Sequence, residues 1–221
     1  MNAKSNKRII DLYFDPVSPY VWLASTQLNR VKKQTGCEVI LKPILFAGLL
    51  KAHGHKGPAE IPAKRDYTFR DVMRRAAIYG LEIQGPPRHP FNPLLALRIC
   101  TAIEDNQVRT KFACLLLDAA WSKGADITNV DTVSKLAREC GIDPDWALAS
   151  SQNPEVKKKL ADTTEAAIAL GMFGVPTFVM DGQLFWGDDR IDELVRYSHG
   201  DRIDETRLAD ILSRESAAKR V

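Results

Sequence analysis

Patterns typical of β-strands occur only near the two ends of the chain, and this placement limits the possible folds. Residues 8–14 and 37–45 are short apolar runs that predict buried strands, with one helix between them. Near the other end, strands at 177–180 and 183–186 flank an Asp-Gly dipeptide, which is typical of hairpin turns. Because two strands alone form no stable sheet, both pairs are expected to share one sheet. The β-α-β order also predicts that the first pair is parallel.

The segment between the two strand pairs carries the periodicity of helices. After a short helix expected around Leu49, helices are predicted at 66–80, 94–105, 109–123, 131–140 and 154–170, and near the C-terminus after Asp189 and at 205–214. A chain of 221 residues accommodates one large domain with an insertion. We therefore predict an α/β fold with a thioredoxin-like core, residues 1–48 and 160–221, split by an all-helical insertion domain, residues 49–159.

Charge and hydropathy argue against several classes of partner. The formal net charge is only +3, and charges of both signs are interspersed, so no face is predicted to bind nucleic acid. The first 14 residues lack the apolar segment of a secretion signal, and no later stretch is long and apolar enough to span a membrane. We therefore expect a cytoplasmic protein that binds neither nucleic acid nor membrane.

The cysteines do not predict redox catalysis. The chain has four of them without any C-x-x-C spacing, and in a protein without an export signal they are expected to be reduced: Cys37, Cys100, Cys114 and Cys140. His53 and His55 have no further ligands near them in the sequence, so no metal site is predicted.

The stretch FDPVSPYVWLA, residues 14–24, places Ser18 at the start of the first predicted helix. Ser18 suits the N-cap position, and Pro19 suits the first helical position. A serine hydroxyl is a poor nucleophile without an adjacent base, and the chain has no G-x-S-x-G motif. A hydroxyl at a helix N-terminus does, however, lower the pKa of a thiol beside it. Ser18 is therefore either a plain helix cap or a group that stabilises a thiolate from another molecule.

Three segments carry a resemblance to a known family: DLYFDPVSPYVWLA, LLKAHGHKGPAEIPAKRDY and GVPTFVMDGQLFWGDDR. Together they resemble the 2-hydroxychromene-2-carboxylate isomerase family, which is related to kappa-class glutathione transferases and, more distantly, to DsbA-type oxidoreductases. Those oxidoreductases carry C-x-x-C at the start of the first helix, where Ser18 and Val21 stand here. Because disulfide exchange needs an attacking thiolate, the resemblance implies that this chemistry is lost.

The resemblance implies that glutathione is the cofactor and that its sulfur lies beside Ser18. In thioredoxin-like folds a cis-proline faces the start of the first helix, so the Val175-Pro176 bond is predicted to be cis. The backbone of Val175 would then pair with the cysteinyl unit of glutathione, which binds as a short added strand.

The γ-glutamyl end of glutathione is implied to meet the segment that follows the hairpin. The contact residues are Trp186, Gly187, Asp188 and Asp189. The two carboxylates would pair with the ligand's ammonium group, and backbone N–H groups of the next helix would hold its carboxylate. Alternatively, Asp189 caps that helix together with Asp192.

Two further groups of residues are implied to contact ligands. Lys51 would hold a glutathione carboxylate, and the Glu60-Ile61 loop would offer backbone contacts. The second group, in the proline-rich loop that borders the second substrate, consists of Arg88, His89 and Asn92. Its arginine suits a carboxylate and its asparagine suits a hydroxyl or carbonyl, although ordinary loop polarity explains these residues equally well.

The resemblance implies a homodimeric, glutathione-dependent isomerase of aromatic catabolism that acts on a small aromatic-derived substrate. It would interconvert 2-hydroxychromene-2-carboxylate and trans-o-hydroxybenzylidenepyruvate by reversible addition of the glutathione thiolate. A kappa-type glutathione transferase, which releases the adduct, has the same site requirements up to the adduct. A binding protein for thiol peptides with a lost redox site is a third interpretation, and turnover of any electrophile would exclude it.

Overall fold

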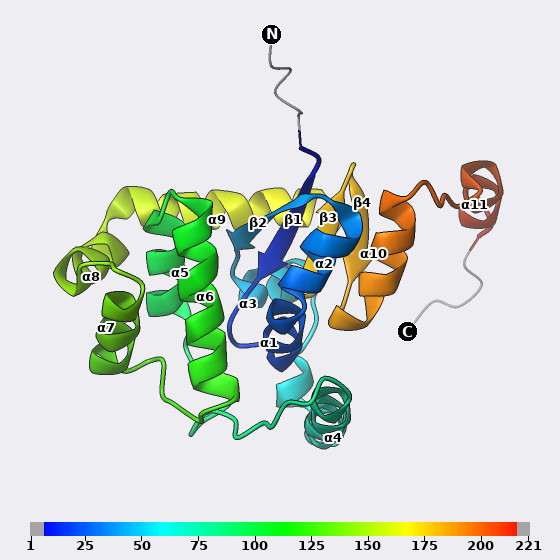
Figure 1. The fold of residues 1–221 in the computed structure, drawn as a ribbon. Coiled ribbons are helices and arrows are strands. Elements are labelled where there is room, and N and C mark those ends of the chain that lie inside the picture. The colour runs from blue at the N-terminus through cyan, green and yellow to red at the C-terminus, as the bar shows by residue number, and fades with distance from the viewer. Residues whose placement is uncertain (1–6, 216–221) are drawn as a thin grey trace, which may run out of the picture.

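The computed structural model describes residues 7–215, and its centre is a mixed four-stranded sheet (Figure 1). The strands are β1 (Ile9–Phe14), β2 (Glu38–Pro43), β3 (Thr177–Met180) and β4 (Gln183–Trp186), in the order β2-β1-β3-β4. β1 pairs in parallel with β2 and antiparallel with β3, and β3 and β4 form an antiparallel hairpin. The predictions of a shared sheet and of a parallel first pair are therefore confirmed.

Helices cover the sheet and form the middle of the chain. They are α1 (Pro19–Thr26), α2 (Leu28–Thr35), α3 (Phe46–Ala52), α4 (Pro62–Ile78), α5 (Leu94–Ala102), α6 (Asn106–Trp121), α7 (Val130–Glu139), α8 (Pro144–Gln152), α9 (Pro154–Ala169), α10 (Ile191–Ser198) and α11 (Glu205–Leu212), with 3-10 turns η1 (Pro58–Glu60) and η2 (Asp188–Arg190). Figure 1 shows α2 in front of the sheet, α10 beside β4, α5 to α8 gathered on the opposite side, and α11 apart from the body. No helix within residues 7–215 is both long and apolar enough to cross a membrane.

The first predicted helix is in fact two helices, because the chain turns at Gln27. The hydroxyls of Ser25 and Thr26 each donate to the carbonyl oxygen three residues earlier, at 2.7 Å. Such local bonds compete with the backbone hydrogen bonds that would continue the helix. The prediction of one continuous helix is therefore wrong.

The helix α8 lies in a segment where the sequence pattern predicts none. It buries only Ala147 and Ser151, so it has no apolar stripe that would reveal it. Its start is nevertheless well marked: Asp143 accepts a hydrogen bond from the backbone N–H of Asp145 at 3.1 Å, and Pro144 occupies the first helical position. The capping signal was therefore present in the sequence where the periodicity was not.

Side chains of the helical middle fix the loop that leads from β1 into α1. The indole N–H of Trp121 in α6 donates to the carbonyl oxygen of Pro16 at 2.9 Å, and it is buried. The imidazole of His89 packs against the Trp121 ring, with 5.3 Å between centroids, and its Nε2 lies 3.0 Å from the carbonyl oxygen of Val17. The start of α1 is thus held from both the sheet and the helical middle.

The predicted division into a split core and an insertion remains a prediction. Residue 160, where the second core segment was expected to begin, lies inside the continuous helix α9. This helix contacts β2 and α3 as well as α5 and α8. α9 therefore belongs to the packing of both predicted units.

Candidate active site

The start of α1 and the residue before Pro176 meet at one end of the two central strands, β1 and β3. The Val175-Pro176 bond is cis, as predicted. Ser18 occupies the N-cap position, but its side chain makes no capping hydrogen bond. Its hydroxyl instead donates to the carbonyl oxygen of Val175 at 3.3 Å, in a place where Ser18 is only 8% exposed. Of the two alternatives for Ser18, side-chain capping is therefore wrong, because the hydroxyl is turned toward Val175.

The backbone around Val175 has the features of an unfilled strand edge. Its N–H makes no hydrogen bond within residues 7–215. The next carbonyl, that of Pro176, accepts from the N–H of Gly187 at 2.9 Å, which ties the end of β4 to the same loop. A backbone N–H held in place without a partner can bind an extended ligand.

Asp15 holds the loop that presents Ser18. Its carboxylate accepts hydrogen bonds from the backbone N–H of Val17 at 3.0 Å and of Phe46 at 2.9 Å. Its carbonyl oxygen accepts from the N–H of Ser18 at 3.1 Å. Burial raises the pKa of this carboxyl to about 7, although the two backbone hydrogen bonds oppose the shift.

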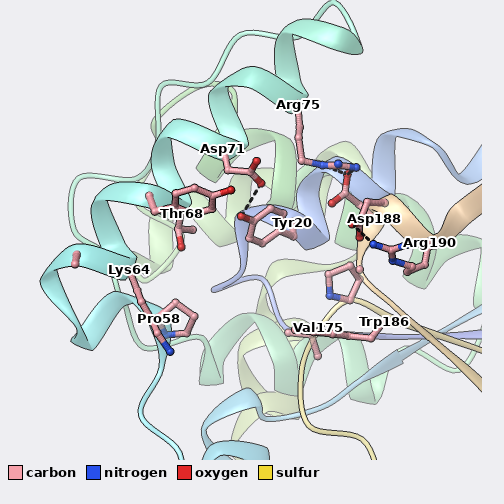
Figure 2. Close-up of a pocket in the computed structure, with 15 residues that line it drawn as sticks. Tyr20, Pro58, Lys64, Thr68, Asp71, Arg75, Val175, Trp186, Asp188 and Arg190 are labelled. Atoms are coloured by element: carbon pink, nitrogen blue, oxygen red, sulfur yellow. Dashed lines mark hydrogen bonds and ion pairs between the residues drawn. The ribbon is translucent and has the colours of Figure 1, made fainter.

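A pocket of about 590 Å³ opens in front of this junction (Figure 2). Its lining consists of Tyr20, Pro58, Ala63, Lys64, Tyr67, Thr68, Asp71, Arg75, Val175, Pro176, Trp186, Gly187, Asp188, Asp189 and Arg190. The sheet edge and the turn η2 form one wall, and α4 forms the other. The volume is in the range of small-molecule sites.

Two polar links tie α4 to the opposite wall of the pocket. The hydroxyl of Tyr20 donates to Asp71 at 2.9 Å, and Arg75 pairs with Asp188 at 2.6 Å (Figure 2). Burial and the Asp71 carboxylate together raise the pKa of Tyr20. Tyr20 is therefore a neutral hydrogen-bond donor at neutral pH.

Six of the residues predicted to bind glutathione line this one pocket: Val175, Pro176, Trp186, Gly187, Asp188 and Asp189. Two glycines allow this arrangement. A Cβ on Gly174 would collide with the indole of Trp186, and a Cβ on Gly187, whose φ is +113°, would collide with the carboxylate of Asp189. Ser18 reaches the pocket through its contact with Val175 and is not itself in the lining.

The other predicted residues lie outside the lining. Lys51 is exposed on α3. Glu60 accepts from the backbone N–H of Gly57 at 2.6 Å, and Ile61 follows it at the start of α4. Both lie on the segment that supplies Pro58 and Ala63 to the pocket.

The residues of the proline-rich loop interact with other parts of the chain and do not line the pocket. Hydrogen bonds from Thr128 and the positive charge of Arg88 lower the pKa of Asp126. Asn92 accepts from the backbone N–H of Leu94 at 3.0 Å, at the start of α5. His89 is half-buried behind the loop of Ser18, and burial lowers its pKa.

Neither predicted acidic residue caps α10. Its N-cap residue is Arg190, and no side chain caps it. Asp189 pairs with Arg190 at 2.9 Å, and Asp192 pairs with Arg30 of α2. The capping alternative for Asp189 is therefore wrong, because Asp189 lies within η2 and Arg190 takes the N-cap position.

The sequence predicts a helix at α4 but does not predict that this helix lines the pocket. Besides Ala63, its pocket-lining side chains are Lys64, Tyr67, Thr68, Asp71 and Arg75. They recur every three or four residues, so they share one face of a helix. That polar stripe, next to the buried residues Val72 and Ala76 on the helix surface, is the signal available in the sequence.

The site contains no thiol of the protein. The lining includes none of the cysteines, which are all free. Burial raises the pKa of Cys100 and Cys140, and that of Cys114 to about 11. Within residues 7–215, no group of three or more His, Cys, Asp or Glu side chains is arranged to hold a metal ion.

The sheet order and the cis-proline opposite the start of α1 define a thioredoxin-fold protein in which a serine heads the first helix. The family model of the DSBA-like thioredoxin domain matches residues 9–198. The chain therefore belongs to the family of DSBA-like thioredoxin domains.

Named relatives fall into two groups of enzymes. The chain is 31% identical over 205 residues to glutathione S-transferase kappa 1 of Homo sapiens, covering 85% of this chain and 89% of that protein. It is 27% identical over 192 residues to 2-hydroxychromene-2-carboxylate isomerase of Sphingobium xenophagum, covering 86% of this chain and 97% of that protein. The resemblance seen in the sequence is confirmed.

A solved structure of a 2-hydroxychromene-2-carboxylate isomerase has the same fold. It matches 93% of this chain and 100% of its own with a TM-score of 0.81 at 22% identity. The predicted α/β, thioredoxin-like fold is therefore confirmed.

Proposed function

We propose that this protein is a glutathione-dependent enzyme that isomerises 2-hydroxychromene-2-carboxylate and trans-o-hydroxybenzylidenepyruvate. The observation that carries the proposal is the meeting of the Ser18 hydroxyl with the backbone of Val175, 3.3 Å apart, beside a pocket without cysteine. Such a site can hold a thiol from outside and has none of its own. The name of the isomerase relative supports this reaction, whereas the name of the kappa transferase supports glutathione as the ligand and favours the alternative reaction.

The residues present fit glutathione. The unpaired N–H of Val175 suits the cysteinyl unit, and the carboxylates of Asp188 and Asp189 suit the γ-glutamyl ammonium. Lys64 lines the pocket and Lys51 does not, so we assign the remaining carboxylate of glutathione to Lys64.

Ser18 acts on the sulfur through a hydrogen bond. When bound, glutathione supplies a thiolate that can add to an electrophilic carbon and leave again. The hydroxyl of Ser18 exchanges its long bond to Val175 for a bond to the sulfur, and the N-terminal end of α1 adds positive potential. Both effects favour the thiolate over the thiol. Ser18 therefore holds the charge and does not attack the substrate.

The second substrate is assigned to the face of α4. Arg88, His89 and Asn92 do not line the pocket, whereas Tyr67 and Thr68 do. Tyr20, at the start of α1, extends toward this face, where Asp71 fixes its hydroxyl. An aromatic-derived electrophile would thus lie between α4 and the thiolate.

Product analysis tests the reaction and its alternative. The protein is mixed with glutathione and 2-hydroxychromene-2-carboxylate, and the products are separated. We expect trans-o-hydroxybenzylidenepyruvate and full recovery of free glutathione. A stable glutathione conjugate would instead establish the kappa-type transferase reaction. Binding of glutathione without turnover of any electrophile would contradict both and favour a thiol-peptide binding protein.

A further inference from the structure

Asp188 is a buried carboxylate held by a helix from the other wall of the pocket. Its side chain is only 2% exposed. From α4, Arg75 places Nε at 2.9 Å and Nη2 at 2.6 Å from the Oδ2 atom of Asp188. The hydroxyl of Tyr79 lies 3.5 Å from the same oxygen. Figure 2 shows the Arg75 side chain leaving α4 and meeting Asp188.

All these contacts fall on one of the two carboxylate oxygens. Oδ1 of Asp188 makes no side-chain hydrogen bond within residues 7–215, and Asp188 lines the pocket. An ionised carboxylate accepts about four hydrogen bonds, so the pairing with Arg75 leaves capacity on Oδ1. The free oxygen can accept a donor from a ligand in the pocket.

The charge of this carboxylate depends on Arg75. Burial raises the pKa of Asp188 above its ordinary value, and the hydrogen bonds and positive charge of Arg75 limit this rise. The nearby carboxylate of Asp189 raises it further. A carboxylate this deeply buried and without a cationic partner would bind a proton instead of remaining ionised.

We propose that Arg75 is a positioning residue for ligand binding: it keeps Asp188 ionised and fixed through Oδ2, so that Oδ1 binds the ammonium group of the γ-glutamyl unit. The proposal rests on the proposed function, because it takes glutathione as the ligand. It assigns Arg75 a role in choosing thiol peptides that carry a γ-glutamyl group over those that do not.

The positive charge of Arg75 also has an effect that opposes ligand binding. The guanidinium of Arg75 is itself a cation and repels an ammonium group in the same pocket. Its charge, however, is directed at Oδ2 and is balanced by the carboxylate. Removing it would leave a buried carboxyl that gains a proton, so the attraction for the ammonium group would be lost together with the repulsion. We therefore expect binding to weaken.

Two probes separate the γ-glutamyl contact from the rest of the site. Affinity is measured by calorimetry for glutathione and for cysteinylglycine, which lacks the γ-glutamyl unit. The unmodified protein should prefer glutathione. Arg75→Met should reduce this preference roughly tenfold or more, since hydrogen bonds to charged groups are strong. Arg75→Lys should retain part of it. The matched control, Arg74→Met on the exposed face of the same helix, should leave the preference unchanged.

A double mutant shows whether Arg75 acts through Asp188. In an Asp188→Asn background, Arg75→Met should not change the preference further. If Arg75→Met does not fold, Arg75→Lys in the two backgrounds gives the same comparison. An unchanged or increased preference for glutathione in the folded Arg75 variants would overturn the inference and leave the proposed function standing. Failure of the unmodified protein to bind glutathione would contradict the proposed function itself.

Discussion

At the scale of residues, the buried Asp15 fixes the position of the loop that carries Ser18. Its two carboxylate oxygens hold the N–H groups of Val17 and Phe46, so one side chain joins the Ser18 loop to α3. Its pKa is raised from 3.8 to about 7 by burial. Between these values the folded protein holds a proton that the unfolded chain has released. The stability must therefore fall as the pH rises from about 4 to about 7, and then level off.

We predict that Asp15→Asn removes this fall in stability. The free energy of unfolding of the variant should also be lower by about 1–3 kcal/mol at pH 5, because its amide nitrogen must face one of the two backbone N–H donors. Urea unfolding between pH 5 and pH 8 measures both effects. Asp162→Asn, at an exposed position, should keep the pH dependence of the unmodified protein. If the stability of Asp15→Asn fell equally steeply with rising pH, Asp15 would not be the source of the pH dependence.

At the scale of elements, α4 is a pocket wall attached by both apolar and polar contacts, since Phe69 packs against the rings of His89 and Trp121. It buries only Val72 and Ala76, and Tyr20–Asp71 and Arg75–Asp188 supply its links to the opposite wall. The sequence predicts a helix here, and its polar stripe is visible. Local sequence does not reveal which surface that stripe faces, because this depends on how α4 packs against α1. The resemblance instead implies that the second substrate borders the loop of Arg88.

We predict that Tyr20→Phe loosens α4 without unfolding the protein. Loss of the bond to Asp71 should cost about 0.5–1.5 kcal/mol and should speed amide hydrogen exchange in α4. Tyr67→Phe is the matched control, because Tyr67 is 63% exposed on the same helix. Equal exchange rates in α4 for Tyr20→Phe and the unmodified protein would refute the role of this link.

For the whole molecule, the strands near the two ends of the chain were enough to predict one shared sheet. The meeting of Ser18 with Val175, 157 residues apart in the chain, was implied by the resemblance and not by the strand pattern. The direction of the Ser18 hydroxyl could not be predicted from the sequence, because a serine at this position can either cap α1 or bond to Val175. The turn at Gln27 was missed for a similar reason, since side-chain hydroxyls altered a helix that the apolar periodicity favours.

We predict that no cysteine of the protein takes part in catalysis. A variant with Cys37, Cys100, Cys114 and Cys140 replaced by Ala should still turn over substrate when glutathione is supplied. Each buried replacement, at Cys37 and Cys100, should cost about 1 kcal/mol of stability. The unmodified protein freed of glutathione should be inactive, and S-methylglutathione should not restore activity. Activity without any external thiol would mean that the reacting sulfur belongs to the protein.

The most direct test of thiolate stabilisation by Ser18 is the pKa of the glutathione thiol in the complex. It is obtained from the ultraviolet absorbance of the thiolate as a function of pH. In the unmodified protein the pKa should lie well below the value of about 8.5 for an ordinary thiol. Ser18→Ala should return it toward that value, whereas Ser25→Ala, which removes a hydroxyl elsewhere in α1, should not. A thiol pKa that is the same in Ser18→Ala and in the unmodified protein would contradict the account.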